Sequence, residues 1–260
     1  YMLDGQSLPL DKRTILLKLK IIGNLFDPTP RSALASQHGP AIETSHGIYA
    51  LRFAGHKELR QPAQWLAMNK ARSLDEFKAA MAMQAIVSFN FVYADAKGNV
   101  YFLHNGKIPE RADGWDWRKY LPGDRSDLIW QSQIGFEDMP QITNPASGYL
   151  LSANQTPFNV TATADNLRRA DYAESLGFQT RMTNRADQGL AMLAAKSRLT
   201  EADFLAVKWD KTYHPTSRAR RYVDQISNLE FDAESPQERG QTLLNSWDGN
   251  TELDNRAAAL

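Results

Sequence analysis

The sequence contains no cysteine. This absence excludes disulfide bonds, thiolate metal sites and cysteine nucleophiles in one step. It does not fix the redox compartment, because exported and intracellular chains can both lack cysteine. Export of the protein therefore stays open.

Long hydrophobic runs and an excess of charge of one sign are also missing. No apolar run approaches the roughly 18 residues that cross a bilayer, so we expect no membrane span. Lysine plus arginine equals aspartate plus glutamate, 30 of each, and the formal net charge is zero. A balanced chain lacks the basic surface that nucleic acid requires, so we expect no nucleic-acid partner.

Several self-contained catalytic motifs are absent. The sequence has no Gly-x-Ser-x-Gly elbow, phosphate-binding loop, dinucleotide fingerprint or His-Glu-x-x-His pair. His38 lies in a His-Gly-Pro turn with no acid or nucleophile beside it, which favours a structural role. At 260 residues the chain is long enough for one large domain with its own core.

The patterns in the first half of the chain predict strands. Apolar residues alternate with lysines over 15–21, which predicts a strand with one solvent-facing side. A Pro-rich loop is expected over 27–30. The aromatic runs 87–95 and 98–103 flank an Asp-x-x-Gly-Asn turn and predict a hairpin.

Helix signals follow. Ser73 and Glu76 form a capping box before an apolar stripe, which predicts a helix. The last 80 or so residues are expected to be helical, since cap residues precede periodic segments there. These predicted helices cover 183–196, 200–210, 217–226 and 235–245.

The stretch 144–185 is the most informative one. The apolar run 148–151 is expected to be a strand whose end presents the carboxamide of Asn154. Such an amide is either a turn former that bonds its own backbone or a donor directed at a ligand. The residues alone leave both alternatives open.

A resemblance to a known family favours the donor. Gly148, Tyr149, Asn154 and Pro157 fall in register with the penicillin amidase family of N-terminal nucleophile hydrolases, and the hairpin region 90–106 matches as well. The resemblance implies an α+β fold, a partial four-layer αββα sandwich with a helical C-terminal part. It divides the chain into a sheet-rich portion, 1–182, and a helical portion, 183–260, of one incomplete structural domain.

The resemblance also implies site residues. Asn154 matches the oxyanion-hole amide, and Arg181 matches an arginine near the catalytic centre, while Arg185 matches a second arginine that faces elsewhere. Phe89 and Ser88 match the wall of the acyl pocket, for which a plain core phenylalanine is the alternative.

One further position of the resemblance concerns a metal. Asp165 matches a position at which several members carry a calcium-ligating aspartate, so a structural calcium ion is a candidate ligand. Catalysis in the family needs no cofactor. The tryptophans at positions 115 and 117 have two alternative explanations, a loop held by buried aromatic side chains or a contact with a ligand.

The nucleophile is expected to lie outside the chain. In this family the α-amine of an initial serine acts as base for its own hydroxyl, and the phenol of Tyr1 cannot do so. The chain is therefore expected to be a β-subunit fragment, inactive alone. Its partners would be the α-subunit and the nucleophile-bearing segment of the same precursor.

The resemblance implies a periplasmic or secreted acylase of linear amides. N-acyl homoserine lactones, lipopeptides and penicillin-like compounds are the expected substrates, with quorum quenching or antibiotic biosynthesis as the setting. Two passages, 4–10 and 247–249, favour acylases of the homoserine-lactone and lipopeptide type. The alternative is a non-catalytic protein that keeps the fold and binds a ligand.

Overall fold

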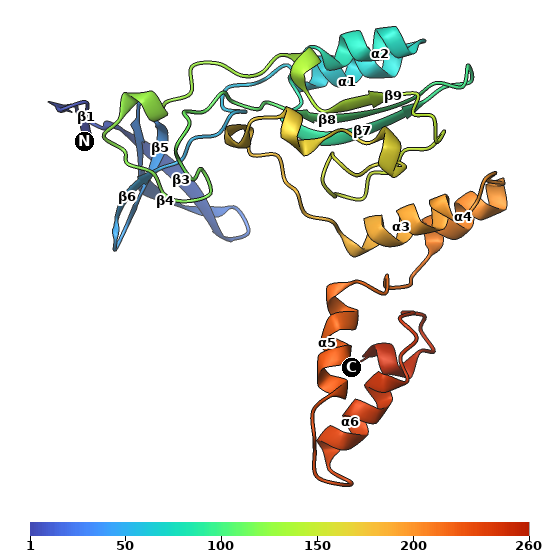
Figure 1. The fold of residues 1–260 in the computed structure, drawn as a ribbon. Coiled ribbons are helices and arrows are strands. Elements are labelled where there is room, and N and C mark those ends of the chain that lie inside the picture. Colours follow the sequence, from blue (N-terminus) through green and yellow to red (C-terminus); the bar gives the residue numbers. More distant parts are fainter. Residues whose placement is uncertain (260) are drawn as a thin grey trace. The chain divides into compact units, whose positions relative to one another are not determined.

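The computed structural model describes residues 1–259 and divides them into two compact units (Figure 1). Unit 1 comprises Tyr1–Phe89, Asn105–Met139 and Tyr172–Gly177. Unit 2 comprises Asn90–His104, Pro140–Asp171 and the chain from Phe178 onward. Each unit is described separately below.

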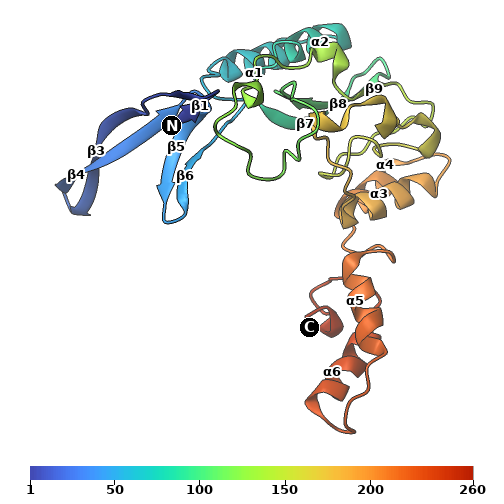
Figure 2. The ribbon, with the colours of Figure 1, turned by 60° about the vertical axis from the view of Figure 1, so that its left-hand side comes forward.

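Unit 1 contains two small antiparallel sheets. One pairs β1 (Met2–Leu3) with β2 (Gln6–Ser7). The other has the order β3-β4-β5-β6, and Figure 2 shows its two hairpins, β3–β4 and β5–β6. Its strands are β3 (Asp11–Ile22), β4 (Leu25–Ser36), β5 (Gly39–Thr44) and β6 (Gly47–Ala50). The predicted strand at 15–21 is thus confirmed and is longer than expected.

The loop predicted over 27–30 is wrong, because this segment belongs to β4. Pro28 lies opposite Lys18 and Pro30 lies opposite Leu16 in the β3–β4 ladder. β5 pairs only with Leu34–Ser36, so the part of β4 that contains both prolines is an edge. An edge strand has no neighbouring strand on its outer side, so the N–H group that proline lacks is not needed for a hydrogen bond there.

The prediction of one solvent-facing side on β3 is also wrong, since every residue of β3 is exposed. One face of this sheet nevertheless carries an apolar row. Ile15, Leu17, Leu19 and Ile21 alternate along β3, and the register places Ile42 of β5 and Tyr49 of β6 on that same face. The exposed fractions of these six side chains lie between 38% and 64%. Exposed apolar patches of this kind are typical of interaction surfaces.

Two helices supply much of the core of unit 1. The helix α1 (Gln61–Lys70) was not predicted, and α2 (Leu74–Met81) is the helix predicted from Ser73 and Glu76. The Ser73 hydroxyl accepts from the Glu76 amide at 3.2 Å. The Glu76 carboxylate accepts from the amide of Arg72 at 2.7 Å, one residue before the expected capping-box partner. The buried residues Phe77 and Met81 of α2 face the core.

The third sheet is antiparallel where its register is defined, and its order is β7-β8-β9. Its strands are β7 (Ser88–Ala94), β8 (Val100–Gly106) and β9 (Gln141–Thr143). The predicted hairpin is confirmed, and its turn is closed by the Asp95 carboxylate, which accepts from the amides of Lys97 and Asn99. Phe102, Ile142 and Val160 form the buried centre of unit 2, against which Leu150 packs.

The strand expected over 148–151 is not formed as a ladder. Gly148 has a positive φ of 73°, and the segment is tied by single bonds instead. The Leu151 amide donates to the Val160 carbonyl at 2.8 Å, and the Thr161 hydroxyl donates to the Tyr149 carbonyl at 2.8 Å. Residues 149–151 are half-buried and lie outside any strand.

The four helices predicted near the C-terminus are confirmed in unit 2, and Figure 1 shows α3 next to α4 and α5 next to α6. Thr183, Thr200, Ser217 and Ser235 cap them, each accepting from a backbone amide of the first turn. The helices are α3 (Asn184–Ala194), α4 (Glu201–Trp209), α5 (Arg218–Ser227) and α6 (Pro236–Asn245).

Short 3₁₀ helices complete the fold. They are Ser126–Leu128, Phe136–Asp138, Thr163–Asp165, Arg169–Asp171, Glu174–Leu176 and Arg256–Ala259. Within residues 1–259, no helix has the length and apolar character needed to span a membrane. The mixture of helices and antiparallel sheets confirms the predicted α+β class. The predicted division at 182/183 stays a prediction.

Candidate functional site

Asn154 occupies the tip of a turn in unit 2 whose shape is fixed by its neighbour. The Gln155 side chain is fully buried, accepts from the Ala153 amide at 2.6 Å and donates to the carbonyls of Leu151 and Asn159. Asn154 itself is exposed and has a φ of 62°, a conformation that asparagine tolerates better than most residues. The turn is therefore held by Gln155, and the side chain of Asn154 is not used to form it.

The side chain of Asn154 instead bonds to Arg185. The Arg185 guanidinium donates from Nη2 to Asn154 Oδ1 at 2.8 Å. Because a guanidinium can only donate, the amide oxygen must face Arg185 and the amide nitrogen must point away from it. Within residues 1–259, Nδ2 of Asn154 has no hydrogen-bond partner. Asn154 thus presents an unused N–H donor with a defined orientation.

The start of α3 brings Arg185 to this position. The Thr183 hydroxyl donates to the Ala153 carbonyl at 2.9 Å and accepts from the Ala186 amide as the helix cap. Arg185 is the second residue of α3, so its side chain leaves from the first turn toward Asn154. The positive end of the helix dipole and the guanidinium both favour negative charge near this turn.

Arg181 lies beside the turn through its backbone. Its carbonyl accepts from the Thr156 amide at 2.9 Å, which joins the segment before α3 to the segment after Asn154. Its guanidinium is exposed and has no hydrogen-bond or ion-pair partner among residues 1–259. Arg185, and not Arg181, contacts the side chain of Asn154, and the roles expected for both arginines stay predictions.

Asp165 lies in a separate, polar part of unit 2. Its Oδ2 accepts from the Ser147 amide at 2.8 Å, and its charge, after burial, contributes to raising the pKa of the Tyr149 phenol. Residues 1–259 contain no cluster of three or more His, Asp or Glu side chains that could hold a metal ion. A calcium ion at Asp165 would therefore need carbonyl, amide or hydroxyl oxygens as further ligands.

Ser88 and Phe89 lie at the start of β7 and belong to unit 1. Both are exposed, and the Phe89 ring meets the Trp65 ring of α1 edge-on, with centroids 6.5 Å apart. The segment before β7 is fixed by Gln64, whose buried amide oxygen accepts from the amides of Ala85 and Ile86 at 2.7 Å. The core alternative for Phe89 is thus wrong. Trp65 joins it as a second exposed aromatic side chain.

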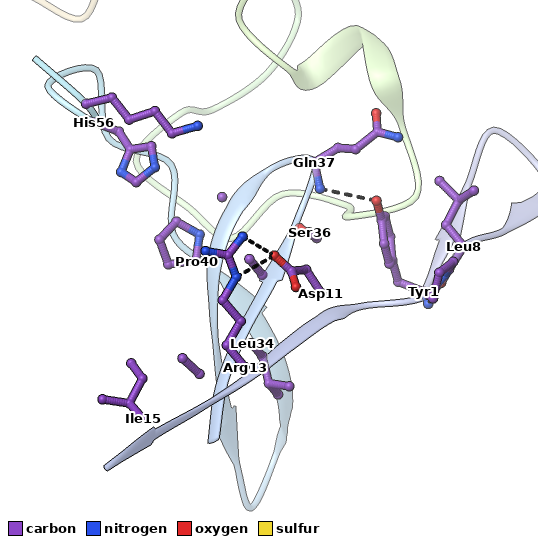
Figure 3. A pocket seen from close by; sticks show the side chains of 15 residues that line it. Tyr1, Leu8, Asp11, Arg13, Ile15, Leu34, Ser36, Gln37, Pro40 and His56 are labelled. Carbon is purple, nitrogen blue, oxygen red and sulfur yellow. Dashed lines mark hydrogen bonds and ion pairs between the residues drawn. The ribbon is translucent and has the colours of Figure 1, made fainter. Parts of the chain in front are cut away.

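Each unit also contains a cavity of several hundred Å³. A cavity of about 830 Å³ in unit 1 borders the exposed β3–β4 hairpin, and Figure 3 shows Tyr1, Gln37 and the Asp11–Arg13 ion pair around it. A cavity of about 890 Å³ in unit 2 is lined by segment 148–153, α3 and α4, with Arg185 among its residues. Of the predicted site residues, none lines either cavity, although the contact between Arg185 and Asn154 borders the second.

Comparison with known proteins decides the family. The family model for penicillin amidase matches residues 1–260. This chain belongs to the penicillin amidase family. The penicillin amidase chain is 28% identical to penicillin G acylase of Escherichia coli over 215 residues, which cover 74% of this chain and 24% of that protein.

A second relative carries a different name. Over 248 residues the chain is 29% identical to the acyl-homoserine lactone acylase PvdQ of Pseudomonas fluorescens strain Pf-5. This match covers 88% of the chain and 29% of that protein. The chain thus spans about a quarter of the length of the curated relatives it matches.

The fold is shared with a solved penicillin amidase. The thermostable penicillin G acylase from Alcaligenes faecalis superposes with a TM-score of 0.70 at 19% sequence identity, covering 98% of this chain and 44% of that one. The predicted fold, part of the N-terminal nucleophile hydrolase sandwich, is confirmed by this likeness.

Proposed function

We propose that this chain is part of an acylase that hydrolyses a linear amide bond, with the attacking serine on polypeptide outside the 260 residues. Membership in the penicillin amidase family supports the reaction class. Relatives named penicillin G acylase and acyl-homoserine lactone acylase support acyl amides as substrates, among them N-acyl homoserine lactones, lipopeptides and penicillin-like compounds. A periplasmic or secreted location forms part of the same proposal.

The observation that carries the proposal is the orientation of Asn154. Attack on an amide carbonyl places negative charge on its oxygen, which needs donors already in position. Nδ2 of Asn154 is such a donor, because Arg185 holds Oδ1 at 2.8 Å and leaves the nitrogen unpaired within residues 1–259. A structural turn amide would instead be spent on its own backbone, and here that role belongs to Gln155.

The proposed substrate contacts are Ser88 and Phe89, with Trp65 beside Phe89. An exposed edge-to-face aromatic pair offers apolar surface to an acyl group at little entropic cost. Phe89 and Ser88 thus stay proposed acyl contacts, and no cofactor is needed for the reaction proposed.

The proposed partners are further segments of the same precursor, including an α-subunit and the segment with the nucleophile. The uncovered apolar face of the β3–β6 sheet supports this part of the proposal, because Ile15, Leu17 and Leu19 would lose solvent contact against another polypeptide. These side chains are 42–49% exposed, so burying each one would contribute less than the roughly 1.5–3 kcal/mol of a fully exposed side chain.

The test uses the intact precursor and two substitutions at Asn154. We expect Asn154→Ala and Asn154→Gly each to lower kcat by about a hundredfold to a thousandfold per mole of matured enzyme, the range for one oxyanion-hole donor. Glycine adopts the positive φ of 62° without strain, so Asn154→Gly separates loss of the donor from backbone strain.

Gln155→Leu serves as the comparison for a disrupted turn. It removes the turn-forming amide and should lower the thermal midpoint. If both Asn154 variants turn over acyl amides like the wild type, the oxyanion assignment is wrong. A matured protein that binds acyl amides without cleaving them would support the alternative, a non-catalytic binding protein.

A further inference from the structure

We propose that His104, which no catalytic step uses, is a positioning residue for the Asn154 turn. This inference rests on the proposed function and names a residue that acts on the donor through two phenylalanines. It starts from the ring of His104 on β8, whose Nδ1 lies 2.7 Å from Oδ1 of Asn90 on β7.

The contact with Asn90 fixes the ring of His104. Since an amide oxygen accepts, Nδ1 carries the proton and donates to Asn90. Burial lowers the pKa of the His104 imidazole to about 4, so the ring is neutral near pH 7. The His104 amide also donates to the Pro140 carbonyl at 2.9 Å, which anchors the backbone. His104 is therefore a fixed, uncharged aromatic surface on the central sheet.

A chain of ring contacts leads from His104 to the site segments. The ring of buried Phe178 meets His104 edge-on, with centroids 5.5 Å apart, and meets Phe158 edge-on at 6.1 Å. The Arg169 guanidinium carbon lies over the Phe158 ring, 5.7 Å from its centroid. The contact between the two phenylalanines joins the segment before α3 to the segment after the Asn154 turn.

The backbone repeats this connection. Phe178 precedes Arg181 by three residues, and Phe158 follows Asn154 by four, while the Thr156 amide bonds to the Arg181 carbonyl at 2.9 Å. The Thr183 hydroxyl and the Arg185 guanidinium add bonds from the start of α3 to Ala153 and Asn154. These bonds tie the two segments to each other, whereas the ring contacts tie them to the sheet through His104. Removing the ring would let the Asn154 turn and the start of α3 shift together.

The experiment is a double-mutant cycle in the intact precursor, measured on matured enzyme with an acyl amide. We expect His104→Ala to lower kcat by about tenfold and up to about a hundredfold, as for a displacement near 1 Å, with KM changed by less than about twofold. In the Asn154→Ala background we expect His104→Ala to have no further effect on kcat, because the donor that it positions is gone.

Ile142→Val is the matched control, since Ile142 is buried in the same unit and takes no part in the ring contacts of His104, Phe178 and Phe158. It should lower the thermal midpoint and leave kcat unchanged in both backgrounds. If His104→Ala does not mature, His104→Phe keeps a ring against Phe178 and removes only the bond to Asn90, so a smaller loss of the same non-additive kind is expected from it.

Two results would overturn the inference. An unchanged kcat in the matured His104 variant would make His104 an ordinary core residue, and so would losses that multiply in the double variant. The proposed function is tested separately by Asn154→Ala alone. If the proposed function is wrong, the kcat of this variant equals that of the wild type, whatever the His104 variants do.

Discussion

Arg185 Nη2 donates to Asn154 Oδ1 at 2.8 Å and thereby decides which end of the Asn154 amide is available. Without this bond the amide could rotate by half a turn and present its oxygen. An oxygen facing the developing oxyanion would repel it, whereas a nitrogen stabilises it. The Arg185 guanidinium therefore orients the side chain, and the Asn154 amide nitrogen is the donor to the oxyanion.

The first prediction concerns Arg185. We expect Arg185→Ala to lower kcat by about tenfold to a hundredfold, less than loss of the donor itself, because part of the amide population keeps the productive orientation. Arg185→Lys should recover part of the loss, since an ammonium still donates to Oδ1. The measurement is kcat of the matured precursor.

Arg181→Ala, assayed alongside, is the comparison for Arg185. Its guanidinium has no partner within residues 1–259, so any loss of kcat would identify a contact with substrate or with polypeptide beyond this chain. If Arg185→Ala has the activity of the wild type, its bond to Asn154 has no catalytic role.

A second prediction concerns calcium at Asp165. We expect a chelator to lower the thermal midpoint of the intact protein and to have no such effect on Asp165→Asn. The asparagine oxygen can still accept from the Ser147 amide, so this variant keeps the observed contact and removes only the charge that a cation needs. A chelator effect of equal size in both proteins would place any calcium elsewhere, and no effect in either would exclude a stabilising ion.

A third prediction follows from burial of His104. The imidazole has a pKa of about 4 in the folded chain and about 6.5 when unfolded. Between these values the unfolded state binds a proton that the folded state does not, so the free energy of unfolding falls as the pH is lowered from about 6.5 to 4. Above about pH 6.5 this loss of stability is absent. Below about pH 4 it is complete and amounts to about 3 kcal/mol at most.

The check is the pH dependence of the thermal midpoint for the wild type and His104→Phe. Burial is the cause of the shift, and the neighbours Asn90 and Phe178 carry no charge. We therefore expect a smaller decrease toward pH 4 in the variant. Parallel curves for the two proteins would show that His104 does not stay neutral on folding.

Local sequence signals were sufficient for the helices of unit 2 and for the β7–β8 hairpin. Thr183, Thr200, Ser217 and Ser235 cap helices where the sequence predicted them, since a cap hydroxyl and the amides it binds are neighbours in the chain. The same locality explains the Asp95 turn. Predictions failed where pairing with a distant segment decided the outcome.

Pro28 and Pro30 show such a failure. Two prolines within three residues favour a loop, yet they lie in β4 because the register with β3 leaves them on an edge. Asn154 and Gln155 show another. Both are turn-compatible amides, and only the packing that buries Gln155 assigns the turn to it and leaves Asn154 exposed.

By itself the sequence determined the α+β class, the family and Asn154 as the residue to examine, because caps, alternation and motif spacing are properties of neighbouring residues. The tertiary structure alone decided that Arg185 orients Asn154, that Trp65 lies against Phe89, and that His104 supports the segments beside the turn. Each of these contacts joins residues 24 to 74 positions apart, a separation that only folding closes.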